Sequence, residues 1–165
     1  MRQSAIILQP AHIYVSRTPT IICAVVGSGV AVCIWDRVLC IGGTTYYKFP
    51  RIHRLTMGSA AYGNVAIPEL LRLLHEHGAK KTHLEAQIIG GATPNWDRTI
   101  TIGEENSEIA RRLLRRNRVT IVSEDTGGIL GRKIAFDTHS GTVAVMKVRL
   151  IRKSDWQFES SNESL

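Results

Sequence analysis

Two short apolar segments without a charged residue, 20–26 and 30–35, are separated only by Gly27, Ser28 and Gly29. Both are rich in β-branched and small apolar residues, a composition typical of strands that are buried on both faces. Two glycines around a serine between such strands predict a bulge or a tight bend. A chain built around this pair must contain a largely buried β-sheet.

The rest of the chain alternates strand-like and helix-like patterns. A third apolar run covers 38–41, and further strands are expected at 44–47, 84–89, 119–122, 133–136 and 142–151, the last two joined by a hairpin loop at 137–141. The order of the elements indicates a mixed α/β class. We therefore predict one layered α/β domain with a mostly buried β-sheet core and two main helices.

Each helix has its own signature. Apolar residues at positions 67, 70, 71 and 74 follow the i, i+3, i+4, i+7 spacing of an amphipathic helix, with Asn64 as its N-cap and an end at Gly78. The second helix runs from about Glu104 to Asn117, with Ile102, Ile109 and Leu113 on its apolar face. Acidic residues open it and arginines close it, which suits the helix macrodipole.

The length of 165 residues predicts a single domain, which we place at 1–152, followed by a polar tail at 153–165 that carries Trp156 and Phe158. Near the N-terminus the apolar run 5–8 is too short for a signal peptide or a membrane span. The sequence therefore predicts a cytoplasmic protein without membrane insertion.

Three cysteines, Cys23, Cys33 and Cys40, lie in apolar surroundings. Their number is odd, and a small thiol packs like an apolar side chain. We expect all three to be reduced and buried. No Cys-x-x-Cys pair occurs, and His75 and His77 are two residues apart on a helix, so no metal site is expected.

A dinucleotide site is also excluded by local sequence. The bend would need a further glycine at position 32 and a following helix, but Val32 lies in a strand-like run. The sequence contains no Walker motif either. We expect no cofactor.

The charge balance is strongly positive. Lys and Arg number 21 against 14 Asp and Glu, a formal net charge of +7, and five arginines crowd one segment, Arg111, Arg112, Arg115, Arg116 and Arg118. Such a balance speeds encounter with nucleic acid, anionic lipid or an acidic protein. Because no aromatic residues interleave with the arginines, a solvated helix face is favoured and nucleic acid is not expected as a partner. An acidic protein partner remains open.

Several segments together carry a resemblance to a known family. They are 27–36 (GSGVAVCIWD), 62–66 (YGNVA), 84–92 (LEAQIIGGA), 102–106 (IGEEN), 124–128 (EDTGG) and the hairpin 131–145. In this order they make the chain similar to the CheD family, the chemoreceptor glutamine deamidases. The similarity extends over about residues 20–150.

The resemblance implies a layered α/β fold shared with some deamidating toxins. It also implies a Cys-His-Thr site that acts on glutamine side chains of chemoreceptor cytoplasmic helices, and association with the CheC phosphatase. In that chemistry a thiolate attacks the side-chain amide, ammonia leaves, and water hydrolyses the thioester. The histidine lowers the thiol pKa and shuttles the proton.

The residues at the three implied site positions differ from that pattern. Gly29 stands where the family's nucleophile follows Gly-Ser, Tyr46 stands at the histidine position when aligned on Phe49-Pro50, and Cys23 stands at the orienting threonine position. Glycine has no side chain to acylate, and tyrosine, with an ordinary pKa near 10, is a poor base at neutral pH. Loss of the nucleophile from a cooperative triad costs about 10⁶ in turnover.

Three hypotheses follow. The favoured one is a catalytically silent member that binds chemoreceptors or a CheC-like partner. The second is an active deamidase with a relocated nucleophile, Cys23, beside Tyr46 and with His53 as a possible base. The third is a basic nucleic-acid or membrane binder that uses the arginine helix.

Overall fold

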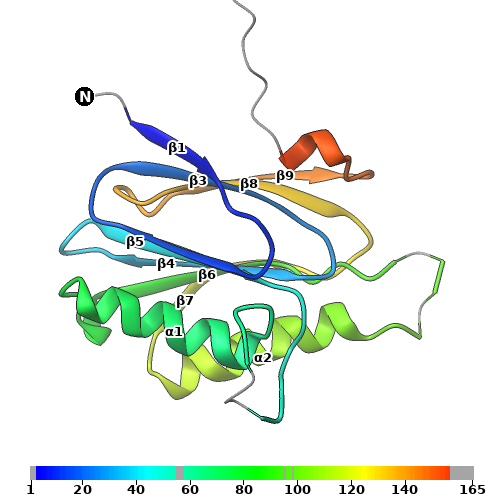
Figure 1. Cartoon of the computed structure of the whole chain (residues 1–165), viewed down its shortest axis with the longest axis horizontal. Coiled ribbons are helices and arrows are strands. Elements are labelled where there is room, and N and C mark those ends of the chain that lie inside the picture. Colours follow the sequence, from blue (N-terminus) through cyan, green and yellow to red (C-terminus); the bar gives the residue numbers. More distant parts are fainter. Residues whose placement is uncertain (1–2, 55–57, 95, 98, 157–165) are drawn as a thin grey trace, which may run out of the picture.

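The chain folds into two stacked β-sheets with two helices covering one of them (Figure 1). The computed structural model describes residues 3–54, 58–94, 96–97 and 99–156. The first sheet has the order β1-β3-β8-β9, with β1 Ser4–Ile7, β3 Thr20–Val26, β8 Gly131–Asp137 and β9 Val143–Val148. The second has the order β2-β5-β4-β6-β7, with β2 His12–Ser16, β5 Ile41–Tyr47, β4 Val30–Asp36, β6 Leu84–Gly90 and β7 Thr120–Thr126.

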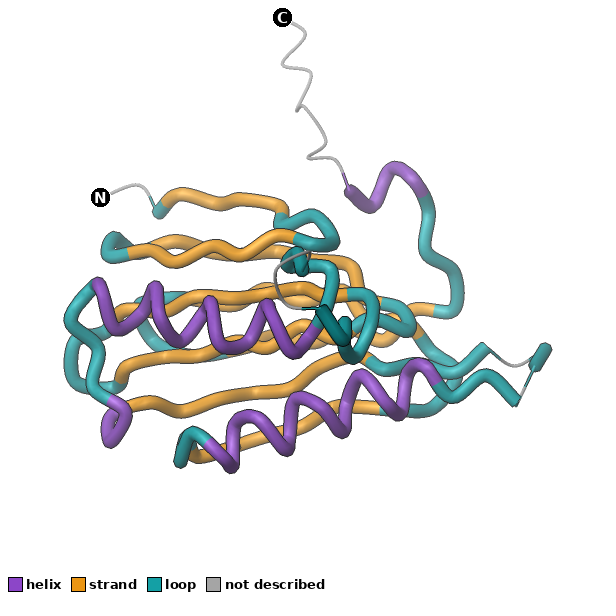
Figure 2. The backbone as a smooth tube through the Cα atoms, turned by 60° about the horizontal axis from the view of Figure 1, so that its bottom comes forward, coloured by secondary structure: helices purple, strands orange, loops and turns teal. Residues whose placement is uncertain are grey.

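Helices α1 (Gly63–Glu76) and α2 (Ile102–Arg116) run side by side along the outer face of the five-stranded sheet (Figure 2). Short 3₁₀ helices occupy Lys81–His83 (η2) and Lys153–Trp156 (η3). The predicted layered α/β domain with two main helices is confirmed. The division of its strands into two sheets was not part of the prediction.

Strand β4 shows why its sequence lacks charge. Val30, Val32 and Ile34 pack toward the helices, whereas Ala31 and Cys33 pack between the two sheets. Side chains of a strand point alternately to its two faces, and here both faces are covered. The predicted burial on both faces is thus confirmed for β4.

Helix α1 begins two residues earlier than predicted, because Asn64 is not its N-cap. The N-cap is Tyr62, and the Asn64 side chain accepts a hydrogen bond from the Ile52 N–H and donates one to the Ile52 carbonyl, both at 2.9 Å. This pair of bonds ties the start of α1 to the segment that follows β5. The short polar side chain serves a tertiary contact instead of a local cap.

The predicted apolar strand at 38–41 is mostly a turn. Strand β5 begins at Ile41, and Cys40 donates its N–H to the Asp36 carbonyl at 2.9 Å. Val38 and Leu39 are exposed at 55% and 47%. An apolar run alone does not distinguish a buried strand from an exposed turn.

The cysteines divide into two groups. Cys33 is buried, as predicted, but Cys23 and Cys40 are only partly buried, and all three are free. Burial raises the pKa of the Cys33 thiol to about 12 despite a hydrogen bond from Thr44. Cys33 is therefore an inert part of the core.

The C-terminal segment touches the four-stranded sheet through Asp155, which pairs with Lys133 of β8. Phe158 and the rest of 157–165 lie outside the described residues, and the boundary at 152/153 stays a prediction. Within the described part of the chain, no helix is long and apolar enough to cross a membrane.

Candidate functional site

The bend at 27–29 connects β3 of one sheet to β4 of the other and is held from three sides. Its three consecutive carbonyls accept hydrogen bonds, in order, from the Ala92 N–H (3.0 Å), the Asn106 side-chain amide (3.0 Å) and the Gly91 N–H (2.8 Å). Buried backbone carbonyls need such partners, and here each has one. The bend is consequently a fixed part of the scaffold.

Asn106 of α2 is the side chain that links this bend to its surroundings. It is fully buried and donates a second hydrogen bond to the Lys48 carbonyl at 2.9 Å, just beyond β5. Its neighbour Gly103 lies so close to Gly91 that an added Cβ would stand 2.5 Å from the Gly91 carbonyl oxygen. These contacts explain why glycine and asparagine occur three residues apart in the 102–106 segment.

Tyr46 fills the space beside Gly29. A Cβ built on Gly29 would stand 2.7 Å from the Tyr46 ring and 2.6 Å from the Tyr47 carbonyl oxygen. Real Cβ atoms do not approach other atoms that closely, so the backbone at residue 29 has room only for glycine. The residues at two of the three implied site positions are thus neighbours, and the Tyr46 ring occupies space that only a glycine at position 29 leaves open.

The Tyr46 hydroxyl is not a base at neutral pH. Burial raises the pKa of Tyr46 to about 12, although a hydrogen bond from the Gly27 N–H acts in the opposite direction. The phenol therefore stays protonated. Its ring belongs to the core between the two sheets, together with Ile22, Ala24 and Cys33.

Cys23 lies on the other face of the four-stranded sheet. Its strand neighbours Ile22 and Ala24 belong to the core between the sheets, and alternation along β3 directs Cys23 away from that core. Burial raises the pKa of the Cys23 thiol, which lowers its thiolate fraction. The structure therefore does not bring Cys23 together with Tyr46.

His53 is exposed and follows β5 on the helix side of the molecule. It lines a cavity of 500 Å³ together with Pro50, Arg51, Glu105, Glu108, Ile109 and Arg112. This cavity is bordered by α2, which covers the five-stranded sheet, whereas Cys23 lies on the four-stranded sheet. Cys23 and His53, the nucleophile and base of the second hypothesis, thus lie on opposite sides of the two stacked sheets.

A groove of 290 Å³ opens beside the bend. Its walls come from four segments: the bend, the residues after β6, the turn that leads into β8, and the end of β9 with the residues that follow it. They comprise Gly27, Ser28, Ala92, Thr93, Pro94, Ile129, Gly131, Val148, Arg149, Leu150 and Ile151. Ile129 and Leu150 are exposed at 58% and 67%. The groove offers apolar contact, one cation and the Ser28 hydroxyl, and among its described lining residues there is neither a thiol nor a histidine.

A buried arginine paired with a half-buried aspartate lies near this groove and was not anticipated from the sequence. Arg132 of β8 is almost fully buried and donates to the Leu130 carbonyl (2.8 Å), to the Gly90 carbonyl (3.4 Å) and to Asp125 of β7 (3.0 Å). It joins the two sheets next to the glycine turn that follows β6. The sequence signal was an arginine at the start of the predicted strand 133–136, since a charge that a strand buries needs a partner.

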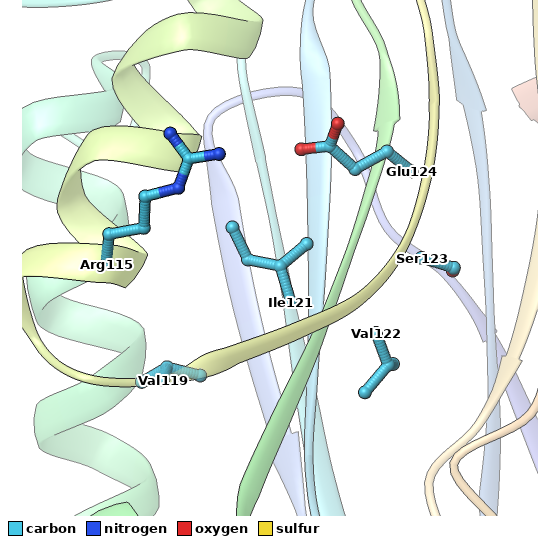
Figure 3. A pocket seen from close by; sticks show the side chains of 6 residues that line it. All are labelled: Arg115, Val119, Ile121, Val122, Ser123 and Glu124. Atoms are coloured by element: carbon cyan, nitrogen blue, oxygen red, sulfur yellow. The ribbon is translucent and has the colours of Figure 1, made fainter.

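The arginine segment of α2 is partly neutralised. Arg111 pairs with Glu124 of β7 (3.0 Å) and with Glu108, and it also donates to Thr126. Figure 3 shows Arg115 of α2 and Glu124 on either side of Ile121 in a 510 Å³ cavity. This cavity lies between the helix and the edge strand. Its lining residues do not include a nucleophilic side chain hydrogen-bonded to a general base.

No cofactor or metal site emerges from the described residues. They contain no group of three or more His, Cys, Asp and Glu side chains placed to hold a metal ion. His75, on the exposed side of α1, contacts the Ala79 carbonyl at 3.3 Å. The histidines of that helix therefore form no ligand set with other described residues.

Comparison with known proteins points to one family. A family model described as CheD chemotactic sensory transduction matches residues 51–147. The chain is 34% identical over 145 residues to a probable chemoreceptor glutamine deamidase CheD of Sulfurimonas denitrificans, with 86% of this chain and 93% of that protein covered.

Two further relatives have the same type of name. A probable chemoreceptor glutamine deamidase CheD 1 of Anaeromyxobacter dehalogenans is 34% identical over 88% of this chain and 86% of its own length. The corresponding protein of Trichlorobacter lovleyi is 36% identical over 82% of this chain and 86% of its own length. Similarity to these relatives thus extends across most of the chain.

Proposed function

Since the chain belongs to the CheD family of chemotaxis proteins, we propose that it is a catalytically silent member that binds chemoreceptors without deamidating them. The contact between Gly29 and Tyr46 carries the proposal. A glycine at the position implied for the nucleophile cannot form a thioester, and the Tyr46 ring and the Tyr47 carbonyl occupy the space that a side chain there would need.

The retained scaffold supports the binding part of the proposal. The hydrogen bonds to the carbonyls of 27–29, the Asn106 contact and the pair of buried Arg132 with Asp125 all surround the bend. A fixed surface of this kind presents the same shape to each partner and loses little conformational entropy on binding. We assign receptor binding to the groove beside the bend, with Ile129 and Leu150 as its exposed apolar contacts.

The proposal includes a cytoplasmic location, where the signalling helices of a chemoreceptor lie, and a CheC-like phosphatase as a second partner. Both are proposed from the family resemblance alone. Either partner can be tested with purified components.

The test measures ammonia release and binding in the same preparation. With a chemoreceptor cytoplasmic fragment that contains glutamine at its modification sites, we expect no ammonia above a buffer blank, but saturable binding by calorimetry. Substituting Ile129→Asp and Leu150→Asp should weaken binding, whereas the control Met146→Asp, exposed on β9 outside the groove, should not. Ammonia release by the wild-type chain, or no binding at all, would contradict the proposal.

A variant that carries the implied catalytic residues tests whether their loss explains the lack of deamidase activity. The double substitution Gly29→Cys with Tyr46→His restores the implied thiol and histidine and replaces the phenol ring beside residue 29 by a smaller imidazole, although the Tyr47 carbonyl must still shift to admit the new Cβ. We expect ammonia release to appear in this variant. The matched control carries Gly29→Ala with Tyr46→His, so it needs the same backbone adjustment but has no thiol.

The alternative is an active deamidase that uses Cys23 as its nucleophile, and the reactivity of the Cys23 thiol distinguishes it from a silent member. Its raised pKa and its position on the far face of the four-stranded sheet argue against it. Iodoacetamide at neutral pH should label Cys23 slowly, at or below the rate of an unstructured thiol. Fast and selective alkylation of Cys23 would favour the alternative.

A further inference from the structure

The end of the sandwich opposite the bend combines exposed cations with two exposed aliphatic side chains. Strand β4 runs from the bend to the turn at 36–40, so that turn lies at the far end of the molecule. Val38 and Leu39 are exposed at its tip. We define the basic end surface as these two residues with five exposed cations, Arg37, Lys80, Lys81, Arg116 and Arg118.

These residues are distant in sequence but contiguous in the fold. Arg37 donates its N–H to the His83 carbonyl at 3.2 Å, which places the turn against η2 and its flanking lysines. Strands β6 and β7 pair in parallel, with Glu85 opposite Thr120. The segments that enter these strands, including Arg118, therefore lie side by side at this end.

A single carboxylate fixes the arrangement. Asp36 is fully buried, and its two oxygens accept hydrogen bonds from the N–H groups of Val38 (2.9 Å), Leu39 (2.9 Å) and Lys80 (3.1 Å). It thereby holds the apolar tip and the lysine segment in one rigid unit. Because the apolar tip is preorganised, binding through it costs little conformational entropy.

The positive charge of this surface is largely uncompensated. In the part of the chain that the structure describes, none of its five cations takes part in an ion pair. Of the nearby acids, Asp36 accepts hydrogen bonds from backbone N–H groups, and Glu76 pairs with Arg72. By contrast, Arg111, at the middle of the same helix as Arg116, is paired with Glu124. Arg116 and Arg118 thus keep their charge at this end of the molecule, whereas the charge of Arg111 is neutralised.

We propose that the basic end surface adsorbs to an anionic membrane, with its five cations against lipid phosphates and Val38 and Leu39 at the level of the headgroups. Basic residues beside exposed aliphatic ones match both components of such an interface. Duplex nucleic acid offers phosphates but no apolar contact for this tip. Adsorption to a membrane surface needs no membrane-spanning segment. The groove beside the bend lies at the opposite end of the molecule and stays accessible, so the proposal is independent of receptor binding.

The experiment is sedimentation of the full chain with vesicles at low and at physiological salt. We expect binding to vesicles made of equal parts phosphatidylglycerol and phosphatidylcholine, weakening as salt rises, and none to pure phosphatidylcholine. Each cation near an anionic surface contributes roughly fivefold to partitioning, so Lys80→Gln with Lys81→Gln should lower binding by roughly 25-fold. The pair Val38→Ser with Leu39→Ser should lower it independently and leave the salt dependence intact.

The matched control removes two cations from the other end of the molecule, by Arg51→Gln with Arg54→Gln, at equal net charge. We expect this control to bind nearly as the wild type does, and urea unfolding establishes that each variant is folded. Absence of binding to the anionic vesicles, equal losses in the two charge variants, or equal binding to the neutral vesicles would overturn the proposal. Stronger retention by duplex DNA or by polyglutamate at the same salt would also overturn it, in favour of an acidic polymer.

Discussion

The two ends of strand β4 are built in opposite ways. At the bend, three backbone carbonyls are held by donors from elsewhere in the fold, and close approaches leave room only for glycine at position 29. At the turn, one side chain, Asp36, gathers three backbone N–H groups and displays its neighbours to solvent. The first end has lost the space for a reactive side chain, whereas the second presents side chains in a fixed array.

The two ends of β4 differ in how many groups hold them in place. At the bend, the carbonyls of 27–29 accept hydrogen bonds from backbone N–H groups and from Asn106, so the side chains of the bend itself contribute nothing to these bonds. The turn depends instead on one carboxylate, so a single substitution should disorganise it. Four predictions follow from this difference, beginning with the largest expected effect.

Substituting Asp36→Ala should be the most damaging change at either end. It leaves three backbone donors without their acceptor, and we expect the free energy of unfolding to fall by about 3 kcal/mol or more. Asp36→Asn keeps one acceptor oxygen and should cost about half as much. Urea unfolding monitored by circular dichroism measures both, and a loss below about 1 kcal/mol in the alanine variant would show that the turn does not depend on Asp36.

Substituting Gly29→Ala should destabilise the bend by about 2 kcal/mol, because its Cβ would overlap the Tyr46 ring and the Tyr47 carbonyl. The matched control is Gly27→Ala, whose Cβ would meet only Ile151 at an ordinary 3.5 Å, with an expected cost within about 0.5 kcal/mol. Combining Gly29→Ala with Tyr46→Ala should recover part of the loss in a double-mutant cycle. Additive effects would show that the ring does not constrain residue 29.

Substituting Asn106→Ala should cost about 1.5 kcal/mol, because the Ser28 and Lys48 carbonyls each lose a donor. The control is Asn117→Ala, whose side chain donates to the Leu113 carbonyl at a partly exposed helix end and whose loss should cost about 0.5 kcal/mol. Thermal unfolding compares the two. Equal losses would mean that Asn106 has no special role in holding the bend.

The smallest effect is the pH dependence of the turn. Burial alone would raise the pKa of Asp36, but hydrogen bonds from Leu39, Val38 and Lys80, together with His83 nearby, lower it below its ordinary value. The stabilisation is therefore fully present above the unfolded pKa of about 3.9, and it is lost as pH falls through the lower folded value. The difference in stability between wild type and Asp36→Asn should shrink only in this acidic range, which urea titrations at several pH values can measure.

Local sequence was sufficient for most elements. Strands β3 and β4, helix α1 and the bend at 27–29 were predicted from uncharged apolar runs, helical spacing and glycine placement. Strands β1 and β2 were not singled out, and the run at 38–41 was predicted wrongly, since its apolar residues lie in an exposed turn that Asp36 organises from within the fold. Asn64 failed as a cap for the same reason, because its best hydrogen bonds lie outside its own helix.

The candidate site also has some features that the sequence predicted and others that only the structure showed. Gly29, Tyr46 and Cys23 could be singled out from sequence by family resemblance, and the lack of a side chain at residue 29 was evident at once. Neither the contact between Gly29 and Tyr46 nor the separation of Cys23 from both could be derived, because each depends on which face of which sheet a residue occupies. The role of Arg132 and the clustering at the basic end were hidden for that reason too.

The amino-acid sequence alone thus determined the elements, the α/β class and the missing nucleophile, because these depend on side-chain identity and on periodicity over a few residues. Only the tertiary structure decided that Tyr46 occupies the space beside Gly29, that Cys23 faces away, and that Arg37, Lys80 and Arg118 lie at one end. Those facts depend on contacts between segments tens of residues apart, and the packing of two sheets sets such contacts where local pattern cannot.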